Sequence, residues 1–211
     1  MHFTKSDIEQ MDRVKRLKII NSVSGIKPAN LIATASESGQ ENVAVFSSVV
    51  HLGSNPALLG FIMRPSDTVP RHTYNNIKST RVYTINHIHK AFAKKAHFTS
   101  AKFDENESEF DTCYLTAEYN NQFKAPFVKE SHFKMGMRFV QEIDIAINST
   151  KMIIGQIEEL IIHDDCWAND DIDLAMVNNV GISGLNTYYA LEKIDRYPYA
   201  RVHEVEDHLK K

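Results

Sequence analysis

The stretch that decides the fold is Phe133-Lys-Met-Gly-Met-Arg-Phe-Val-Gln-Glu-Ile-Asp-Ile-Ala-Ile147. Toward its end three isoleucines alternate with Glu142 and Asp144, which places apolar and charged side chains on opposite faces of an extended chain. Asn148-Ser149-Thr150 has the composition of a turn, and a second strand-like run follows from Met152 to His163. The pattern therefore predicts a long β-hairpin.

Strand-like runs also occupy the first half of the chain. They are Leu31 to Ala35, Val43 to Val50, Ala57 to Met63 and Arg81 to Ile88. Glu37-Ser38-Gly39-Gln40, between the first two runs, is typical of a hairpin turn. The run from Ala57 to Met63 is apolar throughout, which is typical of a strand buried on both faces, although a short buried helix has the same pattern. The capping-box pattern Ser6-x-x-Glu9 predicts an amphipathic helix near 6–16.

Several strands separated by turn signals, with few helical segments between them, favour an antiparallel barrel over an alternating βαβ fold. The fold class that we expect is mainly β, with peripheral helices. A chain of 211 residues is long enough for one domain of generous size. We expect a single domain over 1–211, with a core at about 17–165 and a C-terminal extension at 166–211.

Charge and composition exclude several classes of protein. The formal net charge is −3 and the sequence pI is about 6.4, whereas a dedicated nucleic-acid binder normally has a basic stripe and a high pI. No stretch approaches the roughly 18–20 apolar residues that cross a bilayer, and the N-terminus lacks the apolar region of a signal peptide. The two cysteines, Cys113 and Cys166, lie far apart, which fits a reducing cytoplasm. We expect a cytoplasmic protein with no nucleic-acid or membrane partner.

The familiar catalytic and nucleotide-binding motifs are missing from the sequence. Gly181-Ile-Ser-Gly184 lacks the third glycine and the βαβ context of a dinucleotide fingerprint, so a turn is the better interpretation. His87, His89 and His97 form at best a loose metal set, because no carboxylate or cysteine stands nearby at ligand spacing. No serine or cysteine has the local context of a nucleophile. We therefore expect neither a metal site nor covalent catalysis.

The connection that follows Met63 offers a different way to bind phosphate. Arg64 and Arg71 supply positive charge, and the hydroxyl groups are those of Ser66, Thr68 and Thr73. These are groups that a phosphate dianion at a loop can use. On composition alone, a solvated surface loop explains the segment equally well.

Seven short segments carry a family resemblance through their order and spacing, since no single one is distinctive. They are Asn42-Val-Ala-Val-Phe-Ser-Ser-Val-Val50, Asn55-Pro-Ala-Leu-Leu-Gly-Phe-Ile-Met-Arg-Pro65, Arg71-His-Thr-Tyr-Asn-Asn-Ile77, Tyr83-Thr-Ile-Asn-His87, Ala125-Pro-Phe-Val-Lys-Glu130, Ile154-Gly-Gln-Ile-Glu158 and Gly184-Leu-Asn-Thr-Tyr-Tyr189. In this arrangement the sequence resembles the flavin-reductase-like family with an FMN-binding split barrel. The resemblance covers about residues 17–190.

The resemblance implies a homodimer in which a six-stranded Greek-key split barrel binds FMN, or in some members FAD, at the subunit interface. By position, the residues that would line the isoalloxazine ring are Phe46, Ser47, Ser48 and Val49. Arg64, Arg71 and Thr73 would hold the ribityl phosphate. Arg71-His72-Thr73 takes the place of a Ser-x-Thr pattern after an insertion that contains Ser66-Asp67-Thr68, so it stays open which hydroxyl contacts phosphate.

The resemblance further implies an oxidoreductase that transfers hydride from NADH or NADPH to flavin. The missing catalytic triad agrees with this chemistry, because the cofactors carry the reaction and the protein binds and orients them. Ala44, Phe46 and Val49 would form the apolar wall that a flat ring needs. A flavin-dependent oxygenase is one partner that would receive reduced flavin. Two other interpretations stay open: a noncatalytic FMN-binding sensor or carrier on the same barrel, and the same barrel with a different ligand or partner surface.

Overall fold

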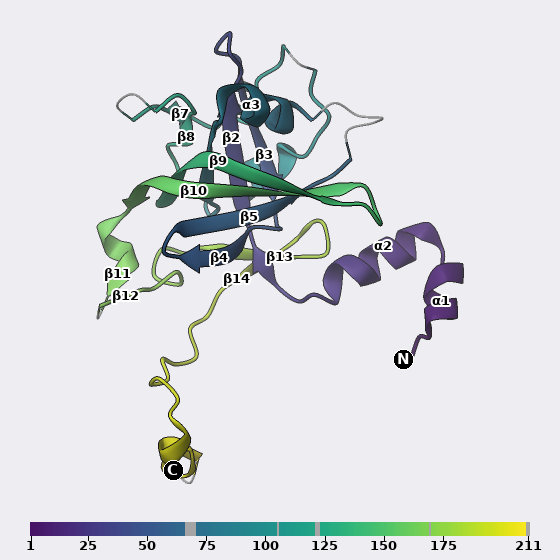
Figure 1. Cartoon of the computed structure of the whole chain (residues 1–211), viewed down its shortest axis with the longest axis vertical. Helices are drawn as coiled ribbons and strands as arrows, with labels where there is room; N and C mark the ends of the chain where they lie inside the picture. The colour runs from purple at the N-terminus through teal and green to yellow at the C-terminus, as the bar shows by residue number, and fades with distance from the viewer. Residues whose placement is uncertain (66–70, 105, 121–122, 169, 210–211) are drawn as a thin grey trace.

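A computed structural model describes the chain except for residues 66–70, 105, 121–122, 169 and 210–211. Its centre is a seven-stranded sheet with the strand order β3-β2-β6-β9-β10-β5-β4 (Figure 1). These strands are β2 (Asn30–Ala35), β3 (Glu41–Phe46), β4 (Val50–Ser54), β5 (Ala57–Met63), β6 (Val82–His87), β9 (Phe133–Ile145) and β10 (Thr150–Ile162). Every neighbouring pair is antiparallel.

The mainly β, antiparallel fold class is thus confirmed. In the part of the chain that the structure describes, no strand pairing joins the two end strands, β3 and β4, so the sheet is open and no closed barrel forms. The Greek-key arrangement of a barrel stays a prediction.

β2 is buried along its whole length. Leu31 and Ala33 pack in one apolar cluster with Phe110, whereas Ile32 packs in a second cluster with Phe61. Because successive side chains of a strand point to opposite faces, one strand contributes to both clusters. The core therefore lies on both faces of the sheet around β2.

The two hairpins expected from the sequence are present. Residues 36–40 form the turn between β2 and β3, where Gly39 has a φ of 88°. The long hairpin of β9 and β10 turns at Ser149, which also has a positive φ of 57°. Near this turn Ile143 and Ile147 are exposed, because the tip of the hairpin extends beyond the apolar clusters.

Two of the strand predictions need correction. The strand expected from Val43 to Val50 is interrupted: β3 ends at Phe46, and β4 starts at Val50. The run from Ala57 to Met63 is a strand, β5, but four of its seven residues are only half-buried, so the interpretation as a strand buried on both faces is wrong. The reason is that β5 pairs with the end strand β4, which is largely exposed.

The single helix expected near 6–16 is also wrong. Two helices occur, α1 (Lys5–Gln10) and α2 (Arg13–Ser22), because Asp12 accepts the backbone N–H groups of Val14 and Lys15 and caps a new helix. The capping box of α1 is formed by Thr4 and Asp7 instead of Ser6 and Glu9. Both helices project from one side of the sheet, and neither contains a buried residue (Figure 1).

The C-terminal segment returns to the N-terminal part of the chain. β13 (Val180–Ser183) pairs with β1 (Lys27–Pro28) and with β14 (Thr187–Ala190). Gly181 thus lies in a strand, and only Gly184, with a φ of 63°, begins the turn that was expected for the whole Gly181–Gly184 segment. After β14 the chain extends away from the sheet (Figure 1).

The remaining elements are short. They are β7 (Ala117–Glu118), β8 (Phe127–Val128), β11 (Trp167–Ala168), β12 (Asp171–Ile172), α3 (His72–Thr80), α4 (Ala93–Phe98), α5 (Glu109–Thr112), α6 (Val205–Leu209), η1 (Asp164–Cys166) and η2 (Val202–Glu204). Among the described residues there is no helix with the length and hydrophobicity needed to cross a membrane.

A substitution at Gly155 tests how closely the backbone of β10 packs against the Tyr83 side chain of β6. A Cβ added there would lie 2.2 Å from the Tyr83 hydroxyl and 3.0 Å from the Arg138 carbonyl. We expect Gly155→Ala to lower the free energy of unfolding by about 1–3 kcal/mol, because the core must shift to admit the methyl group. Urea unfolding at one fixed protein concentration measures the change.

Tyr83→Phe provides the control for this variant. The Tyr83 hydroxyl is buried and has no hydrogen-bond partner among the described residues, so its removal alone costs little. In the Tyr83→Phe background, Gly155→Ala should cost less than in the wild type, because the closest atom is gone. Equal costs in the two backgrounds would contradict the packing described here.

Candidate functional site

The segment that was expected to line a flavin ring forms the link between β3 and β4. Ser47, Ser48 and Val49 follow Phe46 and are half-buried. The Ser48 hydroxyl accepts a hydrogen bond from the Ile62 N–H at 3.0 Å and donates one to the Ile62 carbonyl at 3.4 Å. A side chain thus holds the link against β5 where regular strand pairing stops.

Phe46 and Val49 pack inward from this link. The Phe46 ring meets the Phe61 ring edge-on, with 5.1 Å between centroids, and Val49 packs against the same apolar cluster. Both side chains keep some exposure, so part of each is accessible to a ligand. The structure therefore supplies a partly apolar surface with two hydroxyl groups, at Ser47 and Ser48.

Two of the expected phosphate ligands lie at the ends of the connection between β5 and α3. Arg64 follows β5 directly and is exposed, and Arg71 is the N-cap residue of α3. The Arg71 Nε donates to the Pro65 carbonyl at 3.1 Å, which brings the two ends of the connection together. The first N–H groups of a helix have no partner inside it and carry partial positive charge. Ser66 and Thr68 lie outside the described residues.

Two lysines from other parts of the chain lie near the same helix. Lys151 is the register partner of Met63, the residue before Arg64. Lys78 belongs to α3, and its Nζ donates to the Glu142 carboxylate at 3.1 Å. We call Arg64 and Arg71, at the two ends of the connection, the positive corner. Sequence reasoning missed both lysines, because only strand register and helix packing bring them to Glu142.

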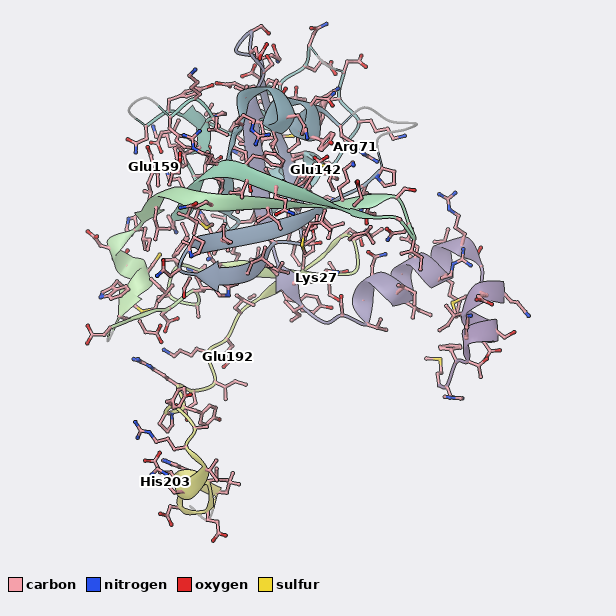
Figure 2. All side chains as sticks on the ribbon, in the orientation of Figure 1. Lys27, Arg71, Glu142, Glu159, Glu192 and His203 are labelled. Atoms are coloured by element: carbon pink, nitrogen blue, oxygen red, sulfur yellow. The ribbon has the colours of Figure 1, made fainter. Side chains whose placement is uncertain are left out.

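Glu142 is the carboxylate that faces these lysines. Figure 2 shows Glu142 and Arg71 at the same end of the molecule. Burial alone would raise the pKa of Glu142, but hydrogen bonds from Lys78 and Tyr74 hold it below its usual range. Lys151 Nζ lies 3.7 Å from the same carboxylate. The negative charge of Glu142 is therefore balanced by the two lysines. The positive charge of Arg64 and Arg71 is available for an anion.

Thr73, the remaining candidate phosphate ligand, anchors α3 on the sheet. Its side chain is buried, and its Oγ1 accepts a hydrogen bond from Asn42 Nδ2 at 3.0 Å. Thr34 accepts from Asn42 at 3.3 Å and from Asn76 at 3.0 Å. The Thr73 hydroxyl retains its own hydrogen as a donor, and its contact with a phosphate stays a prediction.

The three histidines of the candidate metal set each pack against a different ring. His87 stacks on Phe133 with 4.7 Å between centroids, His89 stacks on His132 at 4.3 Å, and His97 packs against β14. In the ranges that the structure describes, no group of three or more His, Cys, Asp or Glu side chains is arranged to hold a metal ion.

A second polar group lies beside Phe46, and of its members sequence reasoning named only His87, as part of a metal set. Asn30 is the register partner of Phe46 in β3 and of His87 in β6. His87 Nδ1 lies 2.9 Å from the Asn179 Nδ2. Burial lowers the pKa of His87 to about 4, so the ring is neutral at pH 7. Strand alternation was the available signal, because it places Asn30 on the same face of β2 as Ile32.

Comparison with known proteins agrees with this architecture. A family model for the flavin reductase like domain matches residues 24–177. The crystal structure of a candidate flavin reductase with a split barrel domain, from Shewanella frigidimarina NCIMB 400, is 46% identical in sequence. It covers 95% of this chain and 100% of its own, with a TM-score of 0.91.

Two more distant structures are similar in fold alone. Nitrilotriacetate monooxygenase component B from Bacillus cereus is 15% identical, covers 93% of this chain and 98% of its own, and has a TM-score of 0.82. An FMN-binding domain of a flavin reductases-like enzyme from Shewanella baltica OS155 is 12% identical. It covers 82% of this chain and 90% of its own, with a TM-score of 0.67.

Protonation of His87 is expected to destabilise the fold below neutral pH. Its pKa is about 4 in the folded chain against an ordinary value of 6.5, so between these values the unfolded chain binds a proton that the native chain does not. The stability that depends on neutral His87 is complete above about pH 6.5 and is lost as the pH falls toward 4. We expect His87→Phe, which keeps a ring against Phe133, to flatten the fall in Tm between neutral pH and about pH 4.5.

Thermal unfolding across this pH range measures the slope for both proteins. Burial and the neighbouring His89 and His163 also lower the pKa of His132, so part of the slope should remain in the variant. An identical slope in the variant and the wild type would contradict the role assigned to His87.

Proposed function

Because this chain belongs to the flavin reductase like domain family, we propose that it is an oxidoreductase that binds FMN and uses it to accept hydride from NADH or NADPH. The observation that carries this proposal is the positive corner at the start of α3, which lies beside the Ser48 link. Arg64 follows Ile62 by two residues, and Ile62 is held by Ser48. One short region therefore combines positive charge with hydroxyl groups and a partly apolar surface.

The donor set of this region fits a ribityl phosphate. A phosphate dianion is stabilised by guanidinium groups and by the free N–H groups at a helix N-terminus. Arg64 and Arg71 would supply the first, and the start of α3 the second. Since lysines balance Glu142, it does not repel the anion. FAD has a diphosphate in place of the single phosphate and stays the second candidate cofactor.

The link from Phe46 to Val49 would support the flavin ring. Phe46 and Val49 offer apolar surface, and the hydroxyls of Ser47 and Ser48 offer hydrogen bonds to ring heteroatoms. Because Ser48 is bonded to Ile62, the link is held in place before any ligand arrives. Bound flavin supplies the hydride chemistry, and the protein contributes binding and orientation.

Homodimerisation is part of the proposal. α1 and α2 project from the sheet without a buried residue, and Val14, Leu17 and Ile20 of α2 are exposed (Figure 1). The segment after β14 also extends away and exposes Tyr197 and Tyr199. Apolar surface of this kind is stabilised when a second chain covers it. We further propose a cytoplasmic location and a flavin-dependent oxygenase as one recipient of reduced flavin.

Arginine substitution tests the phosphate site. Arg71→Ala and Arg64→Ala should each weaken FMN binding about 10- to 100-fold, because each removes a charge-assisted contact. Riboflavin lacks the phosphate, so its affinity should change less than about twofold. Isothermal titration with both ligands measures the difference, and Lys102→Ala, which removes one positive charge from an exposed position away from these elements, serves as the control. Equal losses for FMN and riboflavin would place the phosphate elsewhere.

Anaerobic reduction tests the reaction. We expect the flavin-loaded protein to lose its oxidised-flavin absorbance when NADH or NADPH is added, because hydride reaches the flavin. Flavin that binds tightly and is reduced by neither nicotinamide would favour the alternative, a noncatalytic sensor or carrier. A protein that binds neither FMN nor FAD would refute both.

A further inference from the structure

Three histidine rings form a stack at one end of the sheet, where β6 ends, β9 begins and β10 ends. The rings of His89 and His132 are parallel, with 4.3 Å between their centroids, and the ring of His163 lies 5.2 Å from that of His132. His89 follows the end of β6 by two residues, His132 directly precedes β9, and His163 directly follows β10. We call these three residues the histidine stack. The pairing of the strands, rather than a local sequence pattern, brings the three titratable rings into contact.

The hydrogen bonds of the stack fit uncharged rings. His89 Nδ1 accepts the N–H of Ala91 at 3.3 Å. His163 Nδ1 accepts the N–H of Asp165, also at 3.3 Å. His132 Nδ1 is buried and has no partner among the described residues. A protonated imidazole has a hydrogen on each nitrogen and cannot accept, so protonation would break two hydrogen bonds and leave a buried N–H unpaired.

The charges around the stack also favour neutral rings. Asp165 Oδ2 lies 3.4 Å from His163 Nδ1, but the Asp165 side chain is 75% exposed. The carboxylate of Glu130 accepts hydrogen bonds from Thr116 instead. Two charged rings in contact repel each other, and an exposed carboxylate compensates only part of that repulsion. The stacked arrangement is therefore most stable when its rings are uncharged.

The pKa of His132 gives the direction of the effect. Burial lowers this pKa, and His89 and His163 lower it further, whereas the Val177 backbone and Asp165 act in the opposite direction. A ring that leaves the stack regains its ordinary affinity for a proton. The stability that depends on neutral His132 is thus complete above the ordinary pKa of 6.5 and is lost as the pH falls through the lower pKa of the stacked ring.

The histidine stack adjoins both ends of one chain segment. Residues 164–168 and 170–179, which we call the closing segment, begin directly after His163 and end directly before β13. At the far end of this segment, Asn179 forms an isolated β-bridge with His89. Separation of the stacked rings would therefore loosen the closing segment at both of its ends.

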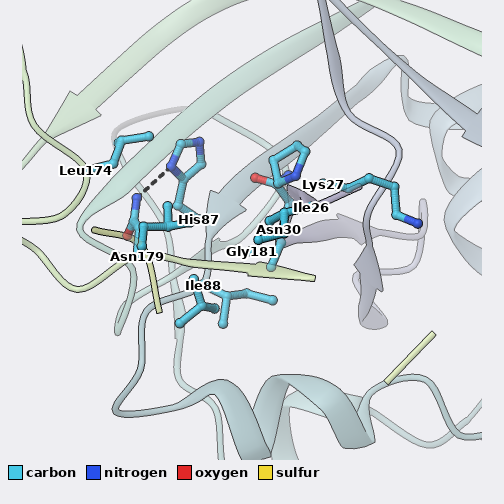
Figure 3. A pocket seen from close by; sticks show the side chains of 12 residues that line it. Ile26, Lys27, Asn30, His87, Ile88, Leu174, Asn179 and Gly181 are labelled. Carbon is cyan, nitrogen blue, oxygen red and sulfur yellow. Dashed lines mark hydrogen bonds between the residues drawn. The ribbon is translucent and has the colours of Figure 1, made fainter. Parts of the chain in front are cut away.

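The closing segment also forms part of the wall of a cavity of about 240 Å³ (Figure 3). Leu174 and Asn179 of this segment line the cavity together with Ile26 and Ile88. Figure 3 shows Leu174 and Asn179 beside His87, with Asn179 hydrogen-bonded to the His87 ring. Release of the closing segment would therefore remove this part of the wall and widen the cavity.

We propose that the histidine stack is an acid-sensitive latch on the closing segment. Neutral rings hold the segment in place, and uptake of protons between about pH 7 and 5 releases it while the seven-stranded sheet stays folded. His87 is not the trigger, because its pKa of about 4 places its protonation at lower pH. The latch is independent of the proposed function, since no ligand takes part in it.

Trp167 reports the state of the latch. It is the single tryptophan of the chain, and it belongs to the closing segment as part of β11. We expect the emission anisotropy of Trp167 to fall between about pH 7.5 and 5, because a released segment is more mobile, while the far-UV circular dichroism of the sheet stays unchanged. The ratio of released to closed segment should rise up to about tenfold per pH unit for each proton taken up. A constant anisotropy, or a simultaneous loss of the dichroism, would overturn the proposal.

Substitution of a stacked ring tests whether the stack is the trigger. His132→Phe keeps a ring in the stack but cannot take up a proton, so it should lower the ratio of released to closed segment at about pH 5.5 at least threefold. His97→Phe is the matched control, because His97 also packs against an aromatic ring, that of Tyr188, but lies outside the stack. Its anisotropy transition should equal that of the wild type. An unchanged transition in His132→Phe would assign the release to another group and refute the latch.

Asp165→Asn gives a second test if His132→Phe folds poorly, because the Asp165 side chain is exposed and its replacement leaves the core intact. The substitution removes a negative charge that favours protonation of the stack, so the midpoint of the anisotropy transition should move to lower pH. A midpoint that stays in place or moves to higher pH would count against the latch.

Discussion

The burial of β2 between two apolar layers is the constraint on which the rest of the structure depends. All six of its residues are buried, with Leu31 in one cluster and Ile32 in the other. A shift of one residue would exchange these side chains between the clusters and turn Asn30 and Thr34 to the opposite face. The register of β3 and β6 against β2 is therefore strongly specified. This register fixes the positions of Thr34 and Asn30, the polar residues at the two ends of β2.

The two ends of β2 have polar side chains in contrasting situations. At one end Thr34 is bonded to Asn42 and Asn76, which holds α3 against the sheet and thereby positions the positive corner. At the other end the Asn30 amide has no partner among the described residues and borders the cavity. The first end is a complete hydrogen-bond network, whereas at the second end the buried amide makes no hydrogen bond within the described residues. The Phe46–Val49 link to β4 begins at the Asn30 end, because Phe46 is the register partner of Asn30.

Local patterns predicted elements well where one signal dominates. The hairpin of β9 and β10 was predictable because its alternation is long and its turn residues are distinctive. The start of the first helix was not, because Thr4 and Ser6 are both acceptable caps and the choice depends on which hydroxyl reaches an N–H group. The end of β3 was also not predictable from the sequence, for a different reason. Two serines between Phe46 and Val49 are compatible with a strand, and the break accompanies the bond between Ser48 and Ile62, 14 residues apart.

The sequence by itself determined the antiparallel β class, most of the strands and the two arginines suited to a phosphate, because these depend on alternation, turn residues and charge within short segments. Only the tertiary structure decided that Lys151 pairs with Met63, that lysines balance Glu142 and that the Asn30 amide has no partner among the described residues. Each of these facts depends on strand register or helix packing between residues distant in the chain. Register is set by the combined burial of both faces of the sheet, and no local pattern of residues contains that information.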